Sequence, residues 1–305
     1  MKKKISKKEF FKFLNLKLDK KFIEEINKKN LYYKKTNNKE KAKLIKIIKN
    51  ITVYKKFIKA GKKYKKKWEV GWDENYKSVK NKFSNKSFIP GYSDKFKYAR
   101  IGTDIVRTYS KNFDHNILQL ILLFCYLRYM KNYKKIIDFG CGTGHAILYL
   151  NRFSKKTNFF GLDWAKSSQK IFKIINRKYP NISGHNFNFF NPNLKLNLNS
   201  NEWAAFTTAS MEQIGKKYRK FYNFLKKKKP GIIVNIEPIP EILSEKKILE
   251  NMSIQYMKKR NYLDGYLNFL TKEEKKNKIK ILFKRKSYFG SFLIYGYSII
   301  IWKFC

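Results

Sequence analysis

The sequence predicts an α/β fold built on a mostly parallel β-sheet with helices on both faces. Apolar segments of strand length alternate with helical patterns from residue 115 to residue 302, which is typical of strand–helix–strand units with right-handed crossovers. A glycine-rich turn joins one strand directly to a helix within residues 135–153. The last two strands follow each other without a helix between them, which indicates an antiparallel hairpin strand at one edge.

The expected elements follow in order along the chain. An apolar helix over 115–130 precedes a buried strand at 135–139, the glycine-rich turn and a helix to about residue 153. The other strands are expected at 158–162, 185–190, 203–209, 232–236, 280–286 and 292–302, and the other helical patterns at 166–178, 216–227 and 242–270. Pro180 and Pro230 follow two of these helices, as expected because proline cannot continue a helix. The pattern therefore gives a seven-stranded sheet.

The composition of the 305 residues fits a globular protein: 43% are hydrophobic and 17% aromatic, too many for a disordered chain. No secretory signal is visible, and the longest central apolar run, Ile117 to Leu127, is too short to span a bilayer. The three cysteines have neither metal-binding nor disulfide spacing. We therefore expect a cytoplasmic protein with no transmembrane segment and no metal.

The net charge of +48 raises the question of a nucleic acid partner, because Lys and Arg neutralise phosphates. Only eight of the 70 basic residues are Arg, the residue best suited to bidentate phosphate contacts. The chain is also rich in Asn, Ile, Tyr and Phe, which like Lys have AT-rich codons. Biased base composition is the simpler explanation, so a nucleic acid acceptor stays open but is not favoured.

Three regions are expected. Residues 1–66 form a basic extension with apolar residues at helical spacing, which predicts two or three amphipathic helices. Such helices can lie on an anionic membrane, so peripheral membrane contact is open, although a lysine-covered helical core explains the pattern as well. Residues 67–114 contain an aromatic, turn-rich stretch from Trp68 to Tyr98, which we interpret as a lid or linker. Residues 115–305 form the alternating domain.

The strongest motif is the glycine-rich turn, Ile136-Ile137-Asp138-Phe139-Gly140-Cys141-Gly142-Thr143-Gly144. Glycine lets a ligand approach the main chain without a Cβ in the way, and the helix that follows presents unpaired N–H groups. The next strand ends at Asp163. A carboxylate at that position can accept hydrogen bonds from both hydroxyls of a ribose. The two features on consecutive strands predict a nucleoside-binding site.

The glycine spacing differs from that of dinucleotide-binding proteins, which place the third small residue where this chain has His145. A G-x-G-x-G turn preceded by an acidic residue resembles that of class I S-adenosylmethionine-dependent methyltransferases, at Asp138, Gly140, Gly142, Gly144 and Asp163. The resemblance covers roughly residue 104 to the C-terminus. It implies a Rossmann-like three-layer sandwich that binds S-adenosyl-L-methionine through these residues and Trp164.

Two later segments extend the resemblance. Asn191 stands where many relatives have an acidic residue that contacts the adenine amino group, and its side-chain carbonyl can accept the same hydrogen bond. The segment from Ala209 to Ile214 resembles the one beside the bound cofactor, which implies a cofactor contact from Ser210. Gln213 replaces a His found in many relatives, and a carboxamide is not a base at neutral pH. The catalytic role of that His is therefore not carried over.

Methyl transfer is an in-line displacement in which the protein mainly aligns the acceptor and excludes water. A hydroxyl acceptor benefits from a general base. His115 and Glu212 are our candidates for this catalytic role, with a surface histidine and a structural salt bridge as the alternatives. Glu237 ends the fifth strand and is expected to contact the acceptor or the cofactor. His145 and His185 are expected to be packed residues.

Two segments outside the sheet are candidates for the acceptor pocket. One contains Arg107 and Tyr109, and the other contains Arg260 and Tyr262. Aromatic rings next to arginine can stack on a sugar or base and hold an anionic group. They can equally belong to a helix that packs its aromatic side.

Taken together, these patterns predict a methyltransferase that acts on an oxygen of a small-molecule or sugar acceptor. The sugar hypothesis rests on a looser likeness of the 260–262 and 285–302 segments to methyltransferases of polysaccharide synthesis. The alternatives are an RNA methyltransferase and a non-catalytic S-adenosylmethionine-binding or scaffold protein. A hydride-transferring enzyme is the least supported.

Overall fold

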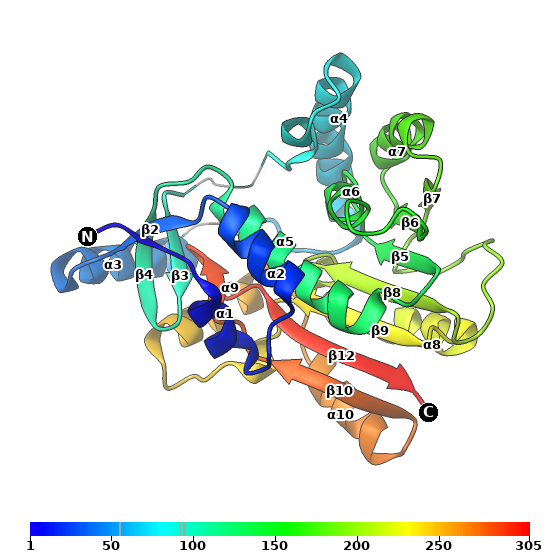
Figure 1. Ribbon diagram of the computed structural model, residues 1–305. Helices are drawn as coiled ribbons and strands as arrows, with labels where there is room; N and C mark the ends of the chain where they lie inside the picture. Colours follow the sequence, from blue (N-terminus) through cyan, green and yellow to red (C-terminus); the bar gives the residue numbers. More distant parts are fainter. Residues whose placement is uncertain (55, 92, 94–95) are drawn as a thin grey trace.

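The computed structural model describes residues 1–54, 56–91, 93 and 96–305 (Figure 1). Tyr92, part of the aromatic stretch noted in the sequence, lies outside the described residues. Two β-sheets and ten α-helices are formed by this part of the chain. None of its helices combines the length and the apolar character needed to cross a bilayer.

The main sheet of the described residues has seven strands in the order β10-β12-β9-β8-β5-β6-β7. Neighbours from β9 to β7 are parallel, whereas β12 is antiparallel to both β9 and β10. The strands are β5 (Lys135–Phe139), β6 (Asn158–Asp163), β7 (Ile182–Asn186), β8 (Trp203–Thr208), β9 (Ile232–Glu237), β10 (Ile279–Arg285) and β12 (Ser298–Phe304). This topology confirms the predicted Rossmann-like sheet and its antiparallel strand.

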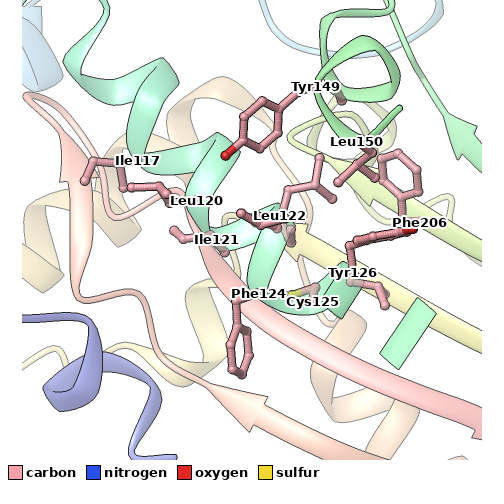
Figure 2. Close-up of a cluster of buried hydrophobic side chains, with 14 of the residues drawn as sticks. Ile117, Leu120, Ile121, Leu122, Phe124, Cys125, Tyr126, Tyr149, Leu150 and Phe206 are labelled. Atoms are coloured by element: carbon pink, nitrogen blue, oxygen red, sulfur yellow. The ribbon is translucent and has the colours of Figure 1, made fainter. Parts of the chain in front are cut away.

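Helices cover both faces of this sheet. One face packs against α1 (Lys7–Leu14), α2 (Lys20–Lys28), α5 (Phe113–Cys125), α6 (His145–Leu150) and α7 (Lys166–Lys178). The other packs against α8 (Arg219–Lys228) and α10 (Tyr266–Lys275). Successive residues of a strand enter opposite layers, as Ile136 and Ile137 do. Figure 2 shows the first layer, where Leu122 and Leu150 approach Phe206 of β8.

The second sheet joins the two ends of the chain. Its five strands among the described residues are β1 (Lys3–Lys4), β2 (Tyr32–Lys35), β4 (Asp104–Thr108), β3 (Tyr98–Ile101) and β11 (Phe289–Ser291), in that spatial order. Beside it lie α3 (Asn38–Tyr54) and α9 (Ile248–Arg260), which pack against each other (Figure 1). The N-terminal region thus contains strands as well as helices, and its Phe10, Phe13 and Phe22 share a core with the main sheet.

Several boundaries differ from those expected. Residues 65–81, interpreted as part of a lid or linker, form the helix α4 (Lys65–Asn81), because Trp68, Trp72 and Val79 recur at helical spacing. β7 begins at Ile182 instead of residue 185, since Phe187 and the aromatic residues after it leave the sheet and pack beside its edge. Residues 292–297 lie between β11 and β12 instead of within one strand. The helical pattern at 242–270 divides into α9 and α10.

Arg100 connects the second sheet to α9. Its side chain is fully buried, and its guanidinium donates hydrogen bonds to the carbonyls of Phe292 (3.1 Å), Leu249 (2.7 Å) and Leu293 (2.8 Å) and to the Ser253 hydroxyl (2.6 Å). No carboxylate is among these partners. Burial lowers the pKa of Arg100 to about 10, so the side chain stays charged at neutral pH. Backbone carbonyls and the Ser253 hydroxyl accept its hydrogen bonds.

We expect Arg100→Leu to lower the free energy of unfolding by about 2–4 kcal/mol, because three carbonyls lose their donor while the cost of burying the charge is removed. Urea unfolding followed by circular dichroism measures this difference. Arg107→Leu on the adjacent strand β4, where the side chain is exposed, is the matched control and should change stability by less than about 0.5 kcal/mol. Equal stability of the two variants would contradict the role given to Arg100.

Candidate active-site cleft

The glycine turn between β5 and α6 has a backbone conformation that residues other than glycine rarely adopt. Gly140, Gly142 and Gly144 have φ values of +83°, +54° and +79°, in the region that favours glycine. A Cβ on Gly140 would lie 2.3 Å from the Cβ of Ser210. The amides of Gly140 and Cys141 donate to the carbonyl of Leu162 at 2.6 and 3.1 Å. These contacts attach the turn to the end of β6.

A cleft with about 700 Å³ of empty space, part of it open to solvent, lies at the carboxyl ends of β5, β6 and β8. This is where the strand order reverses between β5 and β8, the usual ligand position in doubly wound sheets. Its lining consists of Trp68, Trp72, Gly140, Cys141, Gly142, His145, Asp163, Trp164, Phe187, Phe189, Phe190, Thr208, Ala209, Ser210, Gln213 and Ile214. The lining is thus mainly aromatic with a few polar groups.

Asp163 places its carboxylate in this cleft. One oxygen accepts from the amide of Gly142 at 3.0 Å and the other from the amide of Ala165 at 2.9 Å. Burial raises the pKa of Asp163 to about 6, against the opposing effect of these backbone hydrogen bonds. Each oxygen keeps the capacity for a further hydrogen bond from a ligand hydroxyl.

Asp138 lies below the turn on β5 and is fully buried. Neither of its carboxylate oxygens has a hydrogen-bond partner among the described residues. Burial, together with the nearby Asp163 and Glu237, raises the pKa of Asp138 well above its ordinary value. A buried carboxyl without a partner is costly, so this side chain is suited to a cationic or hydrogen-bond-donating group bound at the turn.

Aromatic rings form two walls of the cleft. Trp164 stacks on Phe190 with ring centroids 5.7 Å apart and an interplanar angle of 28°. On the other side, Trp68 and Trp72 of α4 stack with centroids 5.1 Å apart. The Trp72 ring covers Gly142 so closely that a Cβ there would lie 2.8 Å from it. The helix α4 therefore forms a roof over the glycine turn.

Glu69 attaches this roof to the main domain. Its carboxylate accepts from the amides of Lys166 and Ser167, both at 2.7 Å, at the N-terminus of α7. Burial alone would raise the pKa of Glu69, but these hydrogen bonds outweigh it and hold the pKa below its ordinary value. Because Ala165 at the N-cap has no capping side chain, Glu69 caps α7 from another helix.

Glu237 and Glu212 have different roles. The Glu237 carboxylate accepts from the amides of Ser210 (3.1 Å), Met211 (3.1 Å) and Glu212 (3.3 Å). It thereby holds the turn after β8, and burial raises its pKa to about 7. Glu212 accepts from the Gln213 amide nitrogen at 2.6 Å. Burial and the neighbouring Glu237 raise the pKa of Glu212 to about 8.

A cluster around Arg260 borders the cleft. The Arg260 guanidinium donates to the hydroxyls of Tyr64 (3.2 Å) and Tyr262 (3.4 Å) and lies 5.6 Å from the Phe57 ring. The Tyr262 hydroxyl and the guanidinium also favour the ionised form of Glu212. Tyr64 contacts Trp68, and Glu212 contacts Gln213, so the cluster adjoins the cleft from two sides. Within the described residues, Arg260 Nε and Gln213 Oε1 have no hydrogen-bond partner.

His115 lies behind the cleft wall. Its ring is 4.8 Å from that of His145, and its Nε2 is 2.9 Å from the amide nitrogen of Gln119. Gln119 Oε1 accepts from the Lys29 ammonium, so its amide nitrogen is the donor to His115. Burial lowers the pKa of His115 to about 2 and that of His145 to about 4. Both histidines are neutral at physiological pH, and only His145 lines the cleft.

Some of the residues named from the sequence lie elsewhere. Arg107 lies near the end of β4 in the second sheet, Tyr109 directly follows that strand, and both are exposed. Neither is among the residues that line the cleft. Asn191 is exposed and lines a neighbouring hollow with His185 and Asn188. In the part of the chain that the structure describes, no group of His, Cys, Asp and Glu is arranged to hold a metal ion.

Sequence reasoning missed several residues of the cleft. Trp68 and Trp72 were assigned to a lid without a ligand contact, although their spacing of four residues is a signal of a helix. Gln213 was considered only as a replaced base. Ala209, at a φ of +48°, left no signal in the sequence, because only glycine and asparagine are usually expected in that conformation.

No protein-family model matches this chain, and no curated protein is similar to it. Solved structures with a similar fold include the O-methyltransferase NcsB1 from neocarzinostatin biosynthesis, in complex with S-adenosyl-L-homocysteine and 1,4-dihydroxy-2-naphthoic acid. The identity is 12%, the match covers 63% of this chain and 58% of that one, and the TM-score is 0.43.

Two further structures illustrate the range of these similarities. For the methyltransferase domain of bacterial CtHen1-C the identity is 16%, the coverage 62% of this chain and 96% of that one, and the TM-score 0.46. For the [4+2]-cyclase SpnF the identity is 14%, the coverage 64% of this chain and 82% of that one, and the TM-score 0.45. At these identities and TM-scores, the similarities assign neither a reaction nor a ligand to this chain.

The buried carboxyls predict a pH dependence of stability. Since the pKa of Glu212 is about 8 in the folded protein against an ordinary value of 4.5, the folded state holds this proton more tightly than the unfolded state. Its stabilising effect is complete below about pH 4.5 and is lost as the pH rises towards 8, at no more than about 1.4 kcal/mol per pH unit. Glu212→Gln should flatten this decline in urea unfolding series, whereas Glu245→Gln, an exposed control, should not. If stability fell with pH equally in the wild type and both variants, the proton on buried Glu212 would not cause the decline.

Proposed function

We propose that the protein is an S-adenosyl-L-methionine-dependent methyltransferase that methylates an oxygen of a small-molecule or sugar acceptor. The main support for the proposal is the glycine turn with Asp163 at its side. Both lie in the cleft where the strand order reverses between β5 and β8. The mostly parallel seven-stranded sheet with its antiparallel strand, as expected for a Rossmann-like fold, supports the assignment.

The residues of the cleft fit the proposed cofactor. Asp163 has spare acceptor capacity for the two ribose hydroxyls. The stacked Trp164 and Phe190 offer an aromatic surface for the adenine ring. The unpartnered carboxyl of Asp138 suits an ammonium group above the glycine turn. A ligand that carries adenine, ribose and an amino acid would satisfy all three.

The acceptor would occupy the side of the cleft that adjoins Arg260. Gln213 donates through its amide nitrogen to Glu212, so its carbonyl oxygen is the free atom, and this atom is an acceptor only. It is therefore suited to a hydroxyl donor. The unused Nε of Arg260 is suited to an oxygen or anionic group of the same molecule. The Tyr64 and Tyr262 rings pack against the Arg260 guanidinium and fix its position beside the cleft.

When bound, S-adenosylmethionine supplies an activated methyl group on a sulfonium sulfur. The chain's own residues orient the acceptor through Gln213, which accepts from a hydroxyl other than the reacting one, and exclude water through Trp68 and Trp72. Glu212, in its ionised form, takes the proton that the acceptor hydroxyl releases as its oxygen gains the methyl group. The histidines are weak bases, since burial lowers the pKa of His115 to about 2 and that of His145 to about 4, and His115 also lies behind the cleft wall.

Calorimetric titration with S-adenosyl-L-homocysteine tests the cofactor site. Asp163→Ala should weaken binding by roughly 1–3 kcal/mol, because the ribose hydroxyls lose a charged acceptor. Glu202→Ala, an exposed carboxylate outside the cleft, should bind as the wild type does. Unchanged affinity of Asp163→Ala would exclude the ribose assignment, and no binding by the wild type would exclude the cofactor.

The acceptor class is tested by transfer of a labelled methyl group into cell extract that is then separated into RNA, lipid, carbohydrate and small molecules. We expect label in the carbohydrate or small-molecule fraction and none with Asp163→Ala. With that fraction as acceptor, the rate should rise with pH towards about 8, the pKa of Glu212, and Glu212→Gln should be slow at every pH. Label confined to RNA would contradict the proposed acceptor, and an unchanged pH profile in Glu212→Gln would contradict the base.

A further inference from the structure

The C-terminal half of α3 and the loop after it expose apolar side chains to solvent. Ile47, Val53, Tyr54 and Ile58 have exposed fractions of 38%, 47%, 79% and 60%. These four fall within twelve consecutive residues, whereas the other exposed large apolar side chains of the described residues are scattered along the chain. Exposed apolar side chains that gather in one segment can mark a surface that binds a partner. We call Ile47, Val53, Tyr54 and Ile58 the α3 patch.

The arrangement of α3 accounts for this exposure. Leu44, Ile48 and Thr52 recur every four residues and are buried, with Leu44 and Ile48 against the α9 side. Ile47 and Tyr54 are seven residues apart and therefore lie on one face, away from the buried one. The Lys259 ammonium binds the carbonyl of Val53 and fixes the end of the helix. On this side of α3, Ile47 and Tyr54 stay exposed among lysines in the part of the chain that the structure describes.

The charge around the α3 patch is of one sign. From residue 41 to residue 68 the sequence contains twelve lysines and no Asp or Glu. Lys43, Lys46, Lys49, Lys56 and Lys59 of this segment are exposed. Lysine at this density around exposed Ile, Val and Tyr matches the features of a surface that enters the headgroup region of an anionic bilayer.

The observations favour a bilayer over the other occupants. A second copy of this chain would bring another net charge of +48 to the surface, and like charges oppose such a contact. A nucleic acid would be held by the lysines alone, and the exposed Ile and Val side chains would gain nothing from phosphates. An anionic lipid surface satisfies both kinds of side chain, since the ammonium groups meet headgroups and the apolar groups enter the boundary of the acyl chains.

We propose that the α3 patch docks the protein peripherally on membranes that contain anionic lipids. This proposal does not depend on methyl transfer, because the patch and its lysines lie outside the residues that line the cleft. Both contributions are needed: the lysines attract the protein to the surface and the apolar side chains hold it there.

Flotation with vesicles tests the proposal, in the absence of any methyl donor. The wild type should bind vesicles of phosphatidylcholine with phosphatidylserine, fail to bind pure phosphatidylcholine, and lose binding as salt rises. The triple variant I47S/Y54S/I58S, which changes exposed side chains only, should bind at least tenfold less. The control F11S/L282S removes two apolar side chains that are exposed elsewhere and should bind as the wild type does.

Four results would overturn the proposal. If the wild type binds neither kind of vesicle, docking is excluded. If the triple variant binds as tightly as the wild type, the apolar contribution is excluded. A dimer in sedimentation that the triple variant loses assigns the patch to a second copy. Retention of wild type and triple variant alike on single-stranded RNA, without vesicle binding, assigns the lysines to a nucleic acid. Thermal unfolding of each variant verifies that it is folded. Binding of S-adenosyl-L-homocysteine is measured separately, so that a lack of vesicle binding does not count against the cofactor site.

Discussion

The attachment of the glycine turn to the end of β6 determines the rest of the cleft. Two turn amides bind the Leu162 carbonyl, and the Gly142 amide binds the Asp163 carboxylate. The same carboxylate binds the Ala165 amide, which sets where α7 begins. The N-terminus of α7 is in turn the site that Glu69 caps. A short series of hydrogen bonds therefore connects the glycine turn to the helix that roofs it.

Acidic residues surround the cleft, although the chain as a whole is strongly basic. The protein carries 70 basic and 22 acidic residues, yet Asp138, Asp163, Glu212 and Glu237 are all buried at or beside the cleft. Burial raises the pKa of each and so shifts each carboxyl towards its protonated form. A cationic ligand would reverse this preference, because a nearby positive charge stabilises the carboxylates. Such a site therefore discriminates by charge even inside a strongly basic protein.

The sequence predicted what depends on local pattern. Strands β5 and β9 and helix α7 have the expected positions because apolar runs, prolines and glycines mark their ends. The turn and Asp163 were found because backbone conformation restricts the residue types there. What was missed depends on contacts between distant residues. Glu69 caps a helix that begins about a hundred residues later, and Arg260 reaches Tyr64 across a separation of 196 residues. No spacing along the chain encodes either pair.

The N-terminal region shares a hydrophobic core with the main sheet and supplies residues to the cleft. The segment after α3 supplies the Ile58 carbonyl and the Tyr64 hydroxyl to Arg260, and α4 then supplies Trp68 and Trp72 to the cleft. Its basic surface and its cleft-lining face are consecutive stretches of one chain. A bilayer that held the α3 patch would thus hold the edge of the acceptor side as well. Orientation at a surface and access to the cleft would then be coupled through the rigid pairing of α3 with α9.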